Sequence, residues 1–147
     1  MNGNNPLALL ISLAVCIIMI IAVWRIYKKA GEPGWACLIP IYNLFVLLRF
    51  SWKTVIFWLL LLSSVALSVG LTMYQQGSKL GMILTIVGGL LYIILAIMSM
   101  YYLAKSFGKG VGFTIGLLLL APIFILILGF GSAQYVGNGY EIAKGRA

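Results

Sequence analysis

Long runs without a charged residue most constrain what this chain can fold into. No Asp, Glu, Lys or Arg precedes Arg25, and none occurs in 54–78, 80–104 or 110–140. A helix rises about 1.5 Å per residue, so about 20 residues cross a hydrocarbon core about 30 Å thick. None of the runs alternates polar and apolar residues, as the strands of a membrane barrel do. We therefore predict an all-α membrane protein, one integral membrane domain over residues 1–147 with four transmembrane helices at 7–27, 54–74, 81–104 and 112–131.

The apolar segment between Glu32 and Arg49 is too short for a fifth span of the same kind. About 16 helical residues cover about 24 Å, which is less than the thickness of the hydrocarbon core. The segment also contains Pro40 and Asn43, which interrupt an apolar helix. We predict that residues 35–48 form a re-entrant or interfacial segment after the first helix.

The distribution of cations predicts the orientation. With four spans, seven cations share one side (Arg25, Lys28, Lys29, Arg49, Lys53, Lys105 and Lys109) and three lie on the other (Lys79, Lys144 and Arg146). A fifth span would make the division six to four. By the positive-inside rule, the four-span topology has both termini outside and the basic face in the cytoplasm. The basic face is expected to attract anionic lipid headgroups, and no basic run resembles a nucleic-acid-binding module.

The residue types that carry most acid–base and metal chemistry are scarce in this chain. It has no His and no Asp, and its two acids are Glu32 and Glu141. General acid–base catalysis and metal ligation mostly use these side chains. We therefore predict no catalytic residues, no metal site and no cofactor, and a function that is not enzymatic. Proton-coupled transport is also disfavoured, because the four predicted spans contain no carboxylate.

Small residues mark predicted contacts between helices. Gly88 and Gly89 lie in the third predicted span, and Gly112 and Gly116 lie four apart in the fourth. Small residues let membrane helices approach closely, so we predict helix packing at these four positions, within one chain or between chains. Pro122 lacks a backbone donor and is predicted to kink the fourth helix.

Two stretches resemble a known family of small bacterial integral membrane proteins of unknown function. They are YKKAGEPGWACLIPIYNLFVLL at 27–48 and LGFGSAQYVGNGYE at 128–141, and the resemblance covers nearly the whole chain. The matching positions are Lys28, Lys29, Ala30, Gly31, Gly34, Trp35, Ile39, Pro40, Tyr42 and Asn43, followed by Gly129, Phe130, Gly131, Tyr135 and Gly137. A similar domain is joined to the N-terminus of signal peptidase I in some bacteria. The resemblance therefore implies the bacterial inner membrane and an envelope setting, and it supplies no catalytic residues.

The first stretch is the candidate binding motif, made of Lys28, Lys29, Gly31, Gly34, Trp35, Pro40, Tyr42 and Asn43. The alternative is a structural turn that docks the short segment on the helix bundle, with Asn43 bonded to freed backbone or to another helix. The second stretch is predicted to form a glycine-rich lid over the fourth helix on the outer side.

Three functions stay open at this point. The leading hypothesis is a non-enzymatic accessory or scaffold, for envelope protein processing or secretion, that contacts a membrane-protein partner or a second copy of the chain. The alternative is a small oligomeric channel or transporter for an ion or small solute. Lipid handling or membrane-embedded catalysis is a third.

Overall fold

The structure, a computed structural model, describes residues 5–145 and is built from helices. In chain order these are α1 (Pro6–Lys29), the 3-10 helix η1 (Gly34–Leu38), α2 (Pro40–Ser51), α3 (Thr54–Gln75), α4 (Lys79–Ser106), α5 (Val111–Leu119), α6 (Ala121–Phe130) and α7 (Gly139–Ala143). Three of them, α1, α3 and α4, are long and apolar enough to cross a membrane. The helices predicted at 7–27, 54–74 and 81–104 are therefore confirmed, and they indicate a membrane protein.

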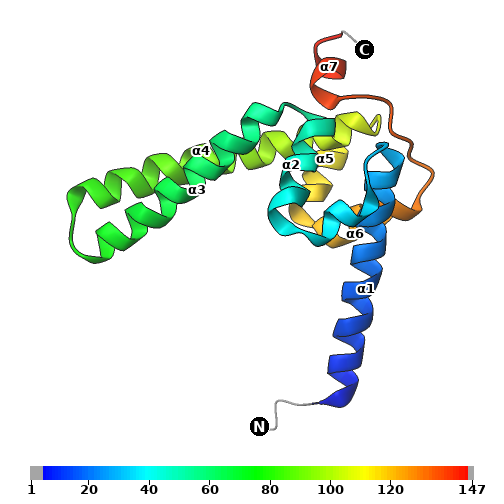
Figure 1. Ribbon diagram of the computed structural model, residues 1–147, viewed down its shortest axis with the longest axis horizontal. Coiled ribbons are helices and arrows are strands. Elements are labelled where there is room, and N and C mark those ends of the chain that lie inside the picture. Colours follow the sequence, from blue (N-terminus) through cyan, green and yellow to red (C-terminus); the bar gives the residue numbers. More distant parts are fainter. Residues whose placement is uncertain (1–4, 146–147) are drawn as a thin grey trace.

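Figure 1 shows two arms that project in different directions from a common head. One arm is the N-terminal part of α1, and the other is the α3–α4 hairpin. The head comprises η1, α2, α5, α6 and α7 with the C-terminal ends of α1 and α4. Its core contains Tyr27, Phe50 and Leu128, together with Phe107. In α1 the buried residues are confined to Ala22, Ile26 and Tyr27 near its C-terminal end, so the rest of the helix has an exposed apolar surface.

Glycines bring α3 and α4 close together in the part of the hairpin next to its turn. A Cβ at Gly70 would lie 2.6 Å from the backbone nitrogen of Thr85, and one at Gly81 would lie 2.4 Å from that of Tyr74. A Cβ at Gly88 would lie 2.9 Å from the nitrogen of Leu67. At Gly89 the nearest atom is a side-chain methyl of Leu67 at 3.5 Å, an ordinary contact. Gly88 is therefore at the centre of the predicted helix contact, and Gly89 is at its edge.

Gly88→Ala is expected to lower the free energy of unfolding by about 1–3 kcal/mol, because the new methyl group meets backbone that must move. The matched control is Gly89→Ala, which changes helix propensity equally but leaves ordinary contact distances. It is expected to be neutral or to stabilise the helix by up to about 1 kcal/mol. Unfolding of both variants in mixed micelles measures the difference. Equal stabilities would contradict the assignment of Gly88 to the helix interface.

The fourth predicted span, 112–131, is wrong as a single crossing helix. The chain breaks at Leu120, where φ is −131° and ψ is 49°, between α5 and α6. Pro122 lies in the first turn of α6, so the predicted interruption of the helix is confirmed. A Cβ at Gly116 would overlap the ring of Phe124, eight positions further on. A straight helix would separate these residues by about 12 Å, so α6 folds back on α5.

The two ends of the α5–α6 pair meet at the head. Gly108 precedes α5 and lies 3.9 Å, measured from a built Cβ, from a methyl of Val136, which follows α6. The Val136 nitrogen also donates to the Ser106 carbonyl at 2.8 Å. Gly116 packs inside this pair, whereas a Cβ at Gly112 has no described atom within 4 Å outside its own helix. The described part of the chain therefore makes no contact at Gly112, and the predicted contact between chains at this position stays a prediction.

The C-terminal segment lies beside the basic ends of the helices, where the predicted topology does not put it. The Tyr135 hydroxyl donates a hydrogen bond to the Phe50 carbonyl at 2.8 Å, and the Gly139 nitrogen donates one to Ser106 Oγ at 2.9 Å. The predicted topology puts the membrane between this segment and those residues. The second motif accordingly does not form an outer lid; it runs along the head between α2 and α4.

Candidate functional site

The first motif begins with a turn that ends α1. Gly31 has a φ of 77°, the left-handed conformation that glycine adopts most readily. Its nitrogen donates to the Lys28 carbonyl at 3.1 Å, and the Glu32 nitrogen donates to the Tyr27 carbonyl at 2.9 Å. This pair of bonds is a Schellman motif, which satisfies the last carbonyls of the helix. Gly31 therefore has a backbone role.

Gly34 has a different role, because an indole ring covers it. A Cβ at this position would lie 2.3 Å from Nε1 of Trp24. Gly34 begins η1, so the missing side chain lets η1 lie flat against the C-terminal part of α1. Pro40 then occupies the first turn of α2, where a missing backbone donor has no cost.

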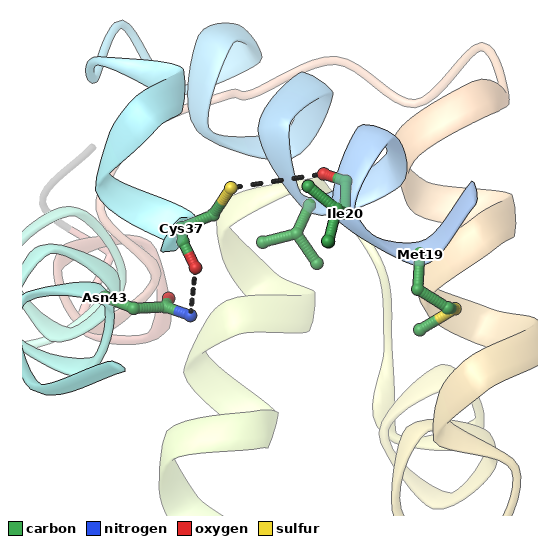
Figure 2. A pocket seen from close by; sticks show the side chains of 5 residues that line it. Met19, Ile20, Cys37 and Asn43 are labelled. Carbon is green, nitrogen blue, oxygen red and sulfur yellow. Dashed lines mark hydrogen bonds between the residues drawn. The ribbon is translucent and has the colours of Figure 1, made fainter. Parts of the chain in front are cut away.

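Asn43 joins three parts of the motif. Its Oδ1 accepts from the hydroxyl of Tyr27, which also donates to the Asn43 carbonyl at 2.7 Å. Its Nδ2 donates to the Cys37 carbonyl at 3.4 Å (Figure 2). Tyr27 is 1% exposed, so these bonds satisfy polar groups inside the head. The side chain of Asn43 thus ties α2 to α1 and to η1.

A small groove opens beside these bonds. It has a volume of about 140 Å³ and is lined by Met19, Ile20, Val23, Cys37 and Asn43 (Figure 2). Cys37 Sγ points toward the Ile20 carbonyl at 4.0 Å. Burial raises the pKa of the Cys37 thiol, so the reactive thiolate is disfavoured. The groove is an apolar space with little polar chemistry.

The two lysines of the motif differ in their contacts. Lys29 Nζ donates to the carbonyls of Leu128 at 2.7 Å and Gly131 at 3.0 Å, at the end of α6. Lys28 is the preceding residue in the helix but is exposed to solvent. Lys29 therefore connects the ends of α1 and α6, where it satisfies carbonyl groups that the helix leaves unpaired.

The aromatic residues of the motif lie on the surface of the head. Trp35 is 49% exposed and stacks on Tyr42, with ring centroids 5.4 Å apart. Leu38, Ile39 and Ile41 extend this exposed apolar surface. The eight predicted residues therefore do not converge on one ligand: some tie the head together, and Trp35 with Tyr42 belongs to an apolar patch.

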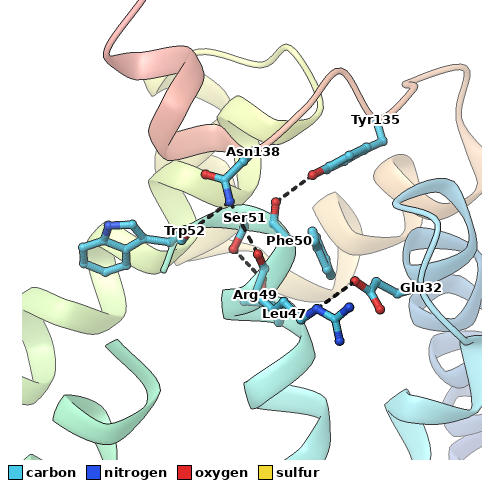
Figure 3. A network of polar contacts seen from close by, with 8 residues as sticks. All are labelled: Glu32, Leu47, Arg49, Phe50, Ser51, Trp52, Tyr135 and Asn138. Carbon is cyan, nitrogen blue, oxygen red and sulfur yellow. Dashed lines mark hydrogen bonds and ion pairs between the residues drawn. The ribbon is translucent and has the colours of Figure 1, made fainter. Parts of the chain in front are cut away.

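A second polar network, which sequence reasoning missed, holds the C-terminal segment (Figure 3). Asn138 Nδ2 donates to the Trp52 carbonyl at 2.8 Å, while its Oδ1 accepts from the nitrogens of Tyr140 at 3.0 Å and Glu141 at 3.4 Å. The same region contains an ion pair, 3.6 Å from Arg49 Nε to Glu32 Oε1. The sequence does contain a signal for this network: Asn138 lies three residues before Glu141, which is the spacing of a helix N-cap.

A family model described as a family of unknown function (DUF5684) matches residues 35–138, which run from η1 to the N-cap of α7. The chain belongs to this family. The DUF5684 region contains Asn43 and Asn138, whereas Tyr27 and Lys29 on α1 lie outside the matched residues. No curated protein and no solved structure matches the chain.

Proposed function

We propose that this DUF5684 protein is a non-enzymatic accessory or scaffold of the bacterial inner membrane, which contacts a transmembrane helix of another membrane protein through α1. An envelope role in protein processing or secretion is part of this proposal. The observation that supports this proposal is the exposed apolar surface of α1. From Leu7 to Ile21 the large apolar side chains other than Met19 are 44–70% exposed, while α3 and α4 already interlock with each other. Lipid or another helix can cover α1, and the second option gives the protein a partner.

The charges of the head support an orientation for this scaffold. Eight of the ten cations lie in or next to the head, while Lys79 starts α4 at the opposite end of the hairpin and Arg146 lies outside the described residues. By the positive-inside rule we place the head in the cytoplasm. The chain then crosses three times, with its N-terminus outside and its C-terminal segment inside. The α5–α6 pair becomes a re-entrant hairpin.

The short segment around η1 and α2 fits the same arrangement. Its exposed patch of Trp35, Leu38, Ile39 and Ile41 borders the basic end of α1. Tryptophan favours the headgroup level of a bilayer. We place this patch in the cytoplasmic interface, as the interfacial form of the segment predicted at 35–48.

Photo-crosslinking tests the scaffold. A photoreactive amino acid at Leu13 or Ile17 of α1 is expected to give an adduct with another membrane protein in the native host. The matched control is Ile86 of α4, which is 53% exposed and is expected to give none. Adducts at Ile86 as strong as those at α1 would indicate random collision. An adduct containing only a second tagged copy would replace the partner with a homo-oligomer. No adduct together with solute flux into reconstituted vesicles would favour the channel alternative.

A further inference from the structure

Two lysines from distant parts of the sequence converge on one tyrosine of the head. Lys53 Nζ lies 4.4 Å from the ring centroid of Tyr140, and Lys144 Nζ lies 4.7 Å from it. Lys53 is the N-cap of α3, and Lys144 is the C-cap of α7. Elsewhere in the head a ring has one lysine, as with Lys105 at 5.6 Å from Tyr101.

The surrounding contacts fix Tyr140 in place. Its ring is 5.7 Å from that of Tyr102, which in turn lies 4.7 Å from the ring of Trp52. The preceding residue, Gly139, approaches the Tyr102 carbonyl so closely that a Cβ there would lie 1.9 Å from the oxygen. Asn138 caps α7 and bonds to the Trp52 carbonyl at 2.8 Å. Neither the ring nor α7 can shift without breaking these contacts.

The two ammonium groups lack a carboxylate partner. Within residues 5–145 the ion pair with an N–O distance under 4 Å is Arg49 with Glu32, and Lys53 and Lys144 are both exposed. The neighbouring ammonium groups, Lys144 first and Lys53 second, lower the pKa of Tyr140. Two positive charges therefore lie over this ring, and Glu141 is the nearby carboxylate, which raises the pKa of Lys144 but does not come within ion-pair distance of it. An anion with several oxygens would neutralise both lysines and accept a hydrogen bond from the Tyr140 hydroxyl.

The position of the cluster selects the kind of anion. Lys53 directly precedes the membrane helix α3, and Tyr102 lies near the end of α4. Trp52 and Tyr102 have the amphipathic rings that favour the headgroup level. Apolar side chains of α3 continue from the same point, with Val55 at 64% and Trp58 at 58% exposure. A ligand here would have phosphate at the lysines and hydrocarbon along α3.

We propose that Lys53, Tyr140 and Lys144 bind the phosphate of one anionic phospholipid, whose acyl chains lie along α3. The site rests on the membrane setting of the proposed function but does not depend on a protein partner. It gives α7 a role, because α7 supplies Tyr140 and Lys144 and is closed onto α4 by Gly139. The lipid would hold α7 against the start of α3.

Lipid titration tests the site. Phosphatidylglycerol added to the purified chain in a neutral detergent is expected to bind with one tight site, observed by native mass spectrometry as one retained lipid per chain. Phosphatidylcholine is expected to bind far more weakly. Each lysine near a headgroup contributes enough to change affinity about fivefold, so Lys53→Gln with Lys144→Gln should weaken phosphatidylglycerol binding about 20-fold or more. Tyr140→Phe keeps the ring and is expected to cost less.

Two control variants separate the site from general charge. Lys79→Gln and Lys105→Gln each remove one cation outside the cluster and are expected to change the affinity less than twofold. An equal loss in these variants, or equal binding of phosphatidylcholine, would overturn the site. Displacement of the lipid by inorganic phosphate at the same concentration would assign the cluster to free phosphate instead. Thermal unfolding of every variant tests whether the fold is kept. Partner adducts on α1 are a separate measurement, so failure of the lipid site leaves the scaffold proposal standing.

Discussion

A cysteine at Lys144 is expected to stay unlabelled by a membrane-impermeant maleimide in intact bacteria, whereas a cysteine at Lys79 is expected to be labelled fully. The α5–α6 pair returns to the head, so the chain after it lies with Lys53 and Lys105, and Lys79 lies at the far end of the α3–α4 hairpin. The labelling experiment uses a chain in which Cys16→Ala and Cys37→Ala remove the native thiols. The effect is all-or-none, because charged reagents do not cross the hydrocarbon core.

Permeabilised cells supply the control for this experiment. Lys144→Cys should become labelled once the membrane is opened, as should Lys109→Cys, which marks the head side of α4 independently. Labelling of Lys144→Cys in intact cells together with Lys79→Cys would mean that 112–131 crosses the membrane after all. That result would restore four spans and both termini outside, and it would require α6 to leave the contacts it makes with α1.

The three long helices could be predicted because their signal is local. Charge-free runs of sufficient length have few stable alternatives in a bilayer, and α1, α3 and α4 occupy them. The fourth run is longer still and is also apolar, so length alone could not reveal the return of α6 onto α5. Pro122 marked the break but not its direction. The direction depends on contacts between distant residues, such as Gly129 against the Ala22 carbonyl at 2.6 Å from a built Cβ.

The sequence showed which side chain of the candidate site required hydrogen-bond partners, but it did not show which groups those partners are. Asn43 in an apolar segment required hydrogen-bond partners, and the structure supplies the Tyr27 hydroxyl and the Cys37 carbonyl. Nothing in the sequence connected Asn43 with Tyr27, because that pairing depends on how η1 folds the chain back. From the sequence, Lys28 and Lys29 were predicted to have the same role in the binding motif. Successive helical residues point about 100° apart, so only one of them faces α6.

Lys29→Met is expected to lower the free energy of unfolding by about 2–3 kcal/mol. Lys29 Nζ donates two hydrogen bonds from a charged group to carbonyls at the end of α6, and methionine can make neither. Loss of these bonds loosens the junction of α1 with α6, where Gly129 lies against the Ala22 backbone. Denaturation in mixed micelles, followed by tryptophan fluorescence, measures the stability.

Lys28→Met is the matched control, since it removes the same charge from the adjacent residue. Lys28 is exposed, so its replacement should change the stability by no more than about 0.5 kcal/mol. A uniform loss in both variants would show that net charge at the end of α1, and not the two bonds, stabilises the head. A loss confined to Lys29→Met would make this lysine the connection through which α1, lying outside the matched family region, is fixed to the part of the chain that defines the family.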